Sequence, residues 1–202
     1  MENPSLINNQ HKTYLIGSME KPAKVDDPRT WRDKISPKLN ERGIYVFDPT
    51  KEETMKVGMP TSELMQKLQG WTQSGNWDLF LQHMDYIWRG KSIVKENDKT
   101  NEPELWHIMG DIDYVINSNF LIGHYVEGDQ MGGTIGELFL AWYLNKPVYW
   151  LMETPRSQFF NKTIIYWILD SGGRQGQIFQ KEHQLIEFLD EKYKFDIKKG
   201  KK

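Results

Sequence analysis

The sequence has no cysteine and little excess charge of either sign. Without cysteine, disulfides, thiolate metal ligands and cysteine nucleophiles are all excluded. The 26 Lys and Arg residues against 28 Asp and Glu residues leave a net charge of −2. Such a chain has no positive field to hold duplex nucleic acid. We therefore expect small-molecule partners, free nucleotides among them, rather than duplex nucleic acid.

Long apolar runs are also missing. No segment approaches the roughly 20 apolar residues that a membrane-spanning helix requires, and the first residues lack a charged stretch followed by an apolar core. We therefore expect a cytoplasmic protein with no membrane partner. The length of 202 residues suits one domain with a full core, or one domain with an insertion.

What the sequence does contain is an alternation of strand and helix patterns. Buried-strand patterns occupy residues 13–16, 44–47, 120–122, 148–151 and 177–179. Helical patterns lie between or after them, at residues 26–42, 134–144, 159–169 and 182–193. This alternation predicts an α/β fold with a parallel, doubly wound sheet.

Residues 50–102 interrupt the alternation. Apolar and aromatic residues recur at helical spacing over 77–88, with Ser74 or Asn76 as the N-cap. The charged segment 91–102 is typical of a surface loop, and Pro103 predicts the start of a helix that runs to residue 116. The predicted organisation is a single domain, 1–202, with a helical insertion at about 50–102 and a basic C-terminal tail at 196–202.

Glu137 is the only charged side chain in an apolar predicted helix, and two explanations for it stay open. In the first, Thr134 and Glu137 form a capping box, in which the glutamate only satisfies a backbone donor at the helix start. In the second, Glu137 lies near the carboxyl end of a parallel strand, beside a turn at Gly132 and Gly133. Open α/β sheets bind ligands there, and the helix dipole would keep the carboxylate ionised and nucleophilic.

The sequence predicts no metal site and no cofactor. Asp111 and Asp113 form an Asp-x-Asp pair, but about 100° of helical rotation per residue puts their carboxylates roughly 200° apart. The five histidines show no spacing typical of metal ligands. Residues 133–136 lack the lysine of a phosphate-binding P-loop and the three glycines of a dinucleotide fingerprint.

Several segments occur in an order that resembles the nucleoside 2-deoxyribosyltransferase family, over roughly residues 13–152. They are residues 14–18 (YLIGS), a helix with Trp31, residues 42–49 (RGIYVFDP), Asp111, and residues 118–122 (SNFLI), 133–138 (GTIGEL) and 145–148 (NKPV). The resemblance implies a five-stranded, flavodoxin-like parallel sheet with helices on both faces. It also implies a homo-oligomer in which neighbouring subunits complete each other's sites.

The resemblance assigns three catalytic roles. Glu137 matches the nucleophile that attacks C1′ of the sugar and expels the base, and Tyr14 matches the tyrosine whose hydroxyl steadies that carboxylate. Asp111 matches an aspartate that handles protons on the base. Where the family has another aspartate, two residues before the glycine of its Gly-Thr turn, this sequence has Met131. Asp129 lies two residues earlier and reaches the site only if the loop bulges.

The predicted substrate-binding residues lie at strand ends and at the start of the nucleophile helix. Backbone N–H groups and hydroxyls there could hold a 5′-hydroxyl or a 5′-phosphate, although turn or cap formation also explains the hydroxyls. These residues are Gly17, Ser18, Asp48, Asp129, Gly132, Gly133 and Thr134.

Three functions stay open at this stage. The first is transfer of deoxyribose between bases, and the second is hydrolysis of deoxynucleoside 5′-monophosphates. The third is nucleotide binding without catalysis. Arg29 and Arg32 are the only arginines placed to meet a 5′-phosphate. Five aromatic residues on predicted exposed helices, most of them in the insertion, predict a subunit interface or, alternatively, that the insertion forms a lid over the subunit's own pocket. They are Trp71, Trp77, Tyr86, Trp88 and Trp106.

Overall fold

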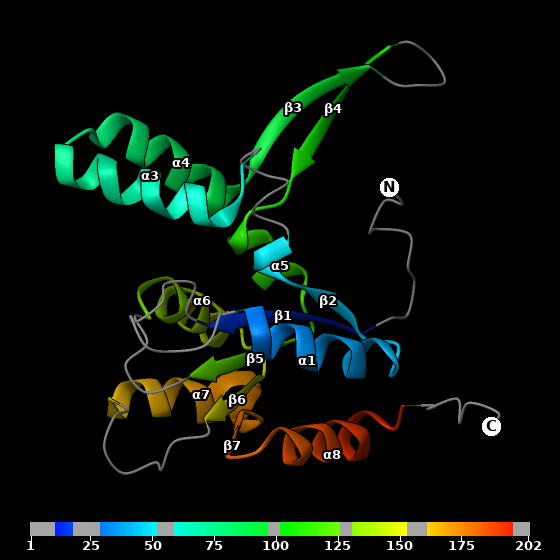
Figure 1. Ribbon diagram of the computed structural model, residues 1–202. Coiled ribbons are helices and arrows are strands. Elements are labelled where there is room, and N and C mark those ends of the chain that lie inside the picture. The colour runs from blue at the N-terminus through cyan, green and yellow to red at the C-terminus, as the bar shows by residue number, and fades with distance from the viewer. Residues whose placement is uncertain are drawn as a thin grey trace. The chain divides into compact units, whose positions relative to one another are not determined.

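The computed structural model describes residues 11–17, 29–51, 59–96, 102–125, 131–152 and 161–195. The chain forms two compact units (Figure 1). An α/β unit is built from Met1–Asp48 and Asn117–Lys202, and the second unit is Pro49–Ile116. The second unit thus reaches beyond residue 102, where the predicted insertion ends. In the described part of the chain, no helix is long and apolar enough to cross a lipid bilayer.

The α/β unit contains a five-stranded sheet in the order β2-β1-β5-β6-β7, and every neighbouring pair is parallel. The predicted fold class is therefore confirmed. The chain leaves β1 toward β2 on one side and continues from β5 on the other, so the strand order reverses between β1 and β5. Ligands of open α/β sheets bind at such a reversal, outside the carboxyl ends of the strands. The strands are β1 (Lys12–Gly17), β2 (Tyr45–Phe47), β5 (Phe120–Tyr125), β6 (Val148–Met152) and β7 (Gln177–Phe179).

Helices cover both faces of the sheet, as predicted (Figure 1). Successive side chains of a strand point to opposite faces. Leu15 packs in a core with Ile35 and Leu189, whereas its neighbour Tyr14 bonds to Glu137. One face therefore carries α1 (Arg29–Asn40) and α8 (Glu182–Tyr193), and the other carries α6 (Gly132–Tyr143) and α7 (Lys162–Arg174).

The start of α6 differs from the prediction. The helix begins at Gly132 rather than after a turn, and its N-cap is Met131, which makes no side-chain capping hydrogen bond. Thr134 is a buried residue of the first turn, not the N-cap. Glycine adopts helical dihedrals as well as turn dihedrals, so two adjacent glycines do not by themselves mark a turn.

The second unit contains a pair of helices, α3 (Thr61–Ser74) and α4 (Trp77–Arg89), which bury Leu64, Leu68 and Ile87. Asn76 caps α4 as predicted, because its side-chain oxygen accepts from the N–H of Leu79 at 3.4 Å.

Two predictions for the second unit are wrong. The segment predicted as a loop contains β3 (Lys91–Glu96), and the segment predicted as a helix begins with β4 (Pro103–Ile108), antiparallel to β3. Only α5 (Asp111–Asn117) is helical in the second segment. The backbone just before β3 lies very close to the end of β4: a Cβ on Gly90 would be 2.1 Å from the carbonyl oxygen of Ile108. Pairing of β4 with the preceding strand β3 overrides the helical spacing of residues 105–116.

Candidate active site

Tyr14 and Glu137 form a buried pair between β1 and α6. The Tyr14 hydroxyl donates to Oε1 of Glu137 at 2.7 Å. Tyr14 is 0% exposed and Glu137 is 7% exposed. The family resemblance implies this hydrogen bond, and the structure contains it. The pair lies next to the β1–β5 reversal, where a ligand is expected.

The capping-box explanation of Glu137 fails. Glu137 belongs to the second turn of α6, whereas a capping-box glutamate belongs to the first turn, three residues after the N-cap. A buried carboxylate is costly unless polar groups support it. Tyr14 supplies such support from a different element of the fold, so Glu137 is not explained by local helix chemistry.

A second buried group lies at the carboxyl end of β1, on the α1 face. The Arg32 side chain, fully buried, donates from Nη2 to the Gly17 carbonyl at 3.0 Å and to the Leu15 carbonyl at 3.4 Å. Its Nε lies 4.0 Å from Oδ1 of Asp48. Arg32 thus connects the end of β1 to the end of β2. The structure brings the predicted substrate residues Gly17 and Asp48 together around this guanidinium.

His124, the second-last residue of β5, belongs to the same group. Its ring stacks on Trp31, with centroids 4.7 Å apart and an interplanar angle of 20°. Burial, together with the nearby charge of Arg32, lowers the pKa of His124 from 6.5 to about 4. His124 is therefore neutral near pH 7. A Cβ on Gly17 would lie 3.0 Å from the His124 carbonyl oxygen and 3.3 Å from the Trp31 ring, so a larger residue would fit only if these neighbours moved slightly.

No motif in the sequence indicates a role for His124 or Trp150. Gly123 of β5 pairs with Ile16 of β1 and with Trp150 of β6. Ile16 is two residues from Tyr14, so these side chains share the α6 face. A Cβ on Gly123 would lie 2.2 Å from the Trp150 indole, which therefore covers the glycine directly. The signal available in the sequence is a glycine inside an otherwise apolar strand.

The other predicted site residues differ in exposure and in the unit to which they belong, and some lie outside the described part of the chain. Gly132 and Gly133 are exposed residues of the first turn of α6, and nothing lies within 4 Å of a Cβ built on either. Ser18 and Asp129 lie outside the described residues. Asp111 begins α5 in the second unit and is buried; its role in proton transfer stays a prediction.

Asp113 has local partners. It accepts from the N–H of Gly110 at 2.9 Å, and its carboxylate lies 2.8 Å from Nε2 of His107. Within the described ranges, no group of three or more His, Asp or Glu side chains could hold a metal ion.

Comparison with known proteins bears on the fold. The sequence matches no protein-family model, and it matches no curated protein. Among solved structures, it resembles a conserved protein from Enterococcus faecalis V583 with a TM-score of 0.52 and 15% identity. That match covers 90% of this chain and 98% of that chain, and it supports the α/β fold described above.

Two enzymes also resemble the chain. One is the CMP N-glycosidase BcmB of Clostridium botulinum, with a TM-score of 0.43, 13% identity, and coverage of 89% of this chain and 99% of that chain. The other is a 2-deoxyribosyltransferase of Bacillus psychrosaccharolyticus, with a TM-score of 0.45, 18% identity, and coverage of 87% and 90%.

Proposed function

We propose that the protein cleaves the N-glycosidic bond of a deoxynucleoside and transfers the sugar to a second base, with Glu137 as the nucleophile. The observation that carries the proposal is the buried hydrogen bond of 2.7 Å between Tyr14 and Glu137. Cleavage of a glycosidic bond passes through an oxocarbenium-like state, which a carboxylate close to C1′ stabilises and can trap.

The proposed reaction has two displacements. In the first, a Glu137 carboxylate oxygen bonds to C1′ while the C1′–N bond breaks. Its electron pair leaves with the base, which takes up a proton from a general acid. In the second, a nitrogen of the incoming base bonds to C1′ while the bond from C1′ to the carboxylate oxygen breaks, and the proton of that base nitrogen passes to the group that protonated the first base. Because Tyr14 donates to one oxygen, it orients the other oxygen for attack and stabilises the carboxylate when it departs.

Two observations favour transfer from a nucleoside over hydrolysis of a 5′-monophosphate. Burial of Glu137 favours exclusion of water from the glycosyl intermediate. Arginine is well suited to bind a 5′-phosphate, but the buried guanidinium of Arg32 already serves the Leu15 and Gly17 carbonyls. The side chain of Arg29 lies outside the described residues.

A two-part assay tests the proposal. The protein is mixed with a deoxynucleoside and a second free base, and separately with a deoxynucleoside monophosphate alone. We expect a new nucleoside in the first mixture and no free base in the second. Free base released only from the monophosphate would make the protein a hydrolase. No product in either mixture would favour the non-catalytic nucleotide-binding module.

The variant Glu137→Gln tests the nucleophile. Gln keeps the volume and an oxygen that accepts from Tyr14, so the melting temperature should change little. It removes the charge, and turnover should fall by roughly a thousandfold or more. Glu182→Gln is the matched control, since Glu182 lies on α8 and pairs with Lys38. Near-normal turnover of Glu137→Gln would refute the assignment.

A further inference from the structure

His124 is a buried polar side chain whose ring makes no hydrogen bond to any residue in the described part of the chain. All five histidines lie in that part, and His124, at 8% exposed, is the only one of them that is buried. Two others have partners within the protein. His83 Nδ1 lies 2.9 Å from the Leu79 carbonyl oxygen, and His107 Nε2 lies 2.8 Å from the Asp113 carboxylate. Since buried polar groups are normally hydrogen-bonded, the ring nitrogens of His124 point to a ligand.

His124 lies where this fold binds ligands. It pairs with Gly17, the last residue of β1, at the reversal of strand order between β1 and β5. Among the described residues, the hydroxyls of Thr13, Ser36 and Ser118 also have no hydrogen-bond partner, but all three are sealed from solvent. The nitrogens of His124 are not sealed in this way, so a ligand outside the strand ends can reach them.

The imidazole of His124 is held in one orientation by its neighbours. Its face stacks on Trp31, with ring centroids 4.7 Å apart. The guanidinium carbon of Arg32 lies 4.8 Å from the centre of the Trp31 ring, and Nη2 of Arg32 donates to the Gly17 carbonyl at 3.0 Å. These contacts use the face of the imidazole and leave the nitrogens on its edge to a ligand.

The charge state of His124 selects the chemistry of the ligand. Burial, together with the charge of Arg32, lowers its pKa to about 4, so the ring is neutral near pH 7. A neutral imidazole has one N–H donor and one acceptor nitrogen, and a hydroxyl group likewise donates and accepts. A phosphate dianion only accepts, and a charged donor binds it better. The neutral ring therefore suits a hydroxyl group rather than a phosphate.

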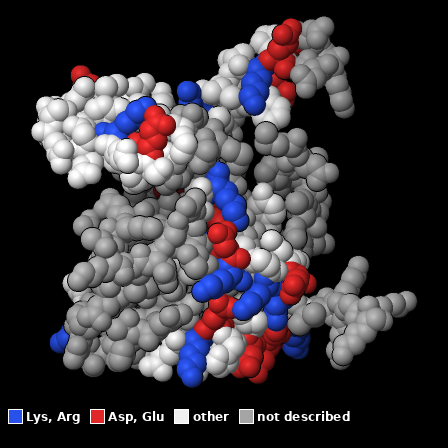
Figure 2. All heavy atoms as spheres, viewed as in Figure 1, with Lys and Arg blue, Asp and Glu red and all other residues white. Residues whose placement is uncertain are grey.

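The charges on the outside of the same face of the sheet agree with an uncharged ligand. Lys38 of α1 pairs with Glu182 of α8, and Arg42, which follows α1, pairs with Asp190 of α8. Figure 2 shows side chains of both charge signs over these two helices. Carboxylates balance the positive charges there, so this surface favours a nucleoside over a nucleotide.

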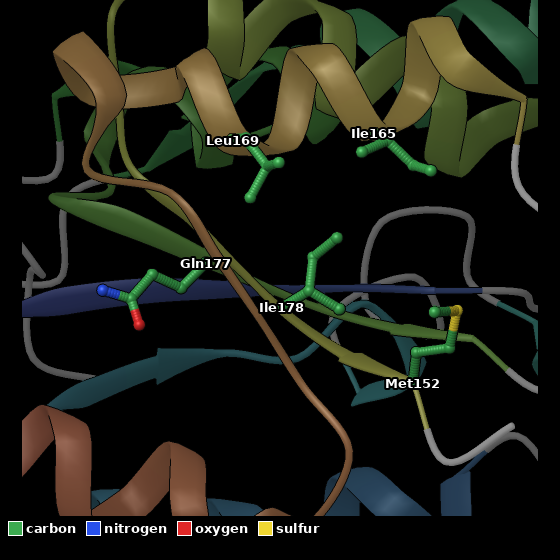
Figure 3. Close-up of a pocket in the computed structure, with 5 residues that line it drawn as sticks. All are labelled: Met152, Ile165, Leu169, Gln177 and Ile178. Carbon is green, nitrogen blue, oxygen red and sulfur yellow. The ribbon is translucent and has the colours of Figure 1, made fainter. Parts of the chain in front are cut away.

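An apolar hollow at the β7 edge of the sheet lacks the groups that a sugar needs. Ile165 and Leu169 point from α7 toward Ile178 of β7, and Met152 and Gln177 complete the lining (Figure 3). The hollow has a volume of about 310 Å³. Its polar residue, Gln177, turns its amide away from the other four side chains (Figure 3). Hydroxyl groups placed among these apolar side chains would lose their hydrogen bonds to water, so this hollow does not compete with the strand ends for a nucleoside.

We propose that His124 is a specificity-determining residue of the proposed reaction, whose neutral imidazole binds a hydroxyl group of the sugar in an uncharged nucleoside. The inference rests on the proposed function, because it takes the nucleoside as the ligand. It adds a contact from the α1 face of the sheet, whereas Tyr14 and Glu137 lie on the α6 face. Ligands of open α/β sheets lie outside the strand ends, where groups from both faces are within reach.

Calorimetric titration tests the contact without turnover, in a full-length Glu137→Gln background. The ligands are a 2′-deoxynucleoside, its 2′,3′-dideoxy analogue and its 2′,5′-dideoxy analogue. We expect one analogue to bind roughly 10-fold more weakly than the nucleoside, because the His124 nitrogens then lose their partner; that analogue identifies the hydroxyl. His124→Phe keeps a ring against Trp31 and should bind the nucleoside and that analogue equally. A purely structural role of His124 would weaken all three ligands by the same factor and would overturn the inference.

Two further variants complete the test. His83→Phe is the matched control, since His83 also stacks on a tryptophan, Trp71, with centroids 4.5 Å apart, but belongs to the second unit; its three dissociation constants should not change. His124→Gln keeps a donor and an acceptor, so it should retain part of the discrimination, and it decides the question if His124→Phe fails to fold. Equal binding of all three ligands before any change at His124 would refute the contact. The expected binding pattern without transfer activity in wild type would refute only the proposed reaction.

Discussion

Replacement of Tyr14 by Phe removes one oxygen from the proposed catalytic pair and leaves the buried ring in place. The lost hydrogen bond has a length of 2.7 Å and a carboxylate acceptor. Hydrogen bonds to charged groups contribute about 1.5–3 kcal/mol, and each 1.4 kcal/mol corresponds to roughly tenfold in rate. The chemical step of Tyr14→Phe should therefore slow by roughly 10- to 100-fold.

Steady-state and single-turnover kinetics measure this effect. Since the Tyr14 hydroxyl serves Glu137 rather than the substrate, kcat should fall while KM changes little. In a background of Glu137→Gln, Tyr14→Phe should have no further effect on the residual rate, because both changes act on one nucleophile.

Tyr149→Phe is a close control. The Tyr149 hydroxyl is 2.9 Å from the Tyr193 hydroxyl, and Tyr149 packs in the core on the α1–α8 face. This variant loses a hydroxyl contact of the same kind away from Glu137, so it should lose stability and keep its rate. Equal rates for Tyr14→Phe, Tyr149→Phe and wild type would refute the catalytic role of Tyr14.

Two further predictions concern stability. The pKa of His124 is about 4 in the folded protein and 6.5 in the unfolded chain. Between pH 6.5 and pH 4, therefore, the unfolded chain takes up a proton at His124 and the folded protein does not. The free energy of unfolding should fall by roughly 3 kcal/mol as the pH drops through this range. Denaturant titrations near pH 7 and pH 4 should show that His124→Phe removes most of this loss; an undiminished loss in the variant would contradict the assignment. Gly123→Ala places a methyl group 2.2 Å from the Trp150 indole, so calorimetry should show a loss of about 1–3 kcal/mol in the free energy of unfolding. Gly70→Ala, in open space on α3, is the control and should raise that free energy by up to ~1 kcal/mol. Equal melting temperatures for the two variants would exclude the clash.

The α/β unit is predictable because its strands are buried on both faces. Strands of this kind consist of continuous apolar runs, such as residues 120–122 and 148–151, and turn residues separate them from helices. The pair of Tyr14 and Glu137 could be predicted for a related reason. A single charge in an apolar helix needs a partner from another element, and the resemblance to a known family indicates which tyrosine supplies it.

The hairpin of the second unit could not be predicted in this way. Over residues 103–108, apolar side chains fit either a helix or a strand, since a short segment samples too little of either period. The pairing of β3 with β4 makes residues 103–108 a strand, and this pairing requires the backbones of Gly90 and Gly110 to approach closely. Neither glycine has a local pattern that identifies its distant partner.

Arg32 and Tyr14 connect to β1 on opposite faces of the sheet. A buried guanidinium is costly, and replacement of a buried ion pair by apolar residues is often neutral or stabilising. Arg32 nevertheless lies fully buried, with the carbonyls of Leu15 and Gly17 as acceptors. These carbonyls flank the strand segment that follows Tyr14, whose side chain points to the opposite face. The position of the Tyr14 hydroxyl, and with it the orientation of Glu137, is therefore supported from the opposite face of the sheet, through the hydrogen bonds of Arg32 to the β1 backbone.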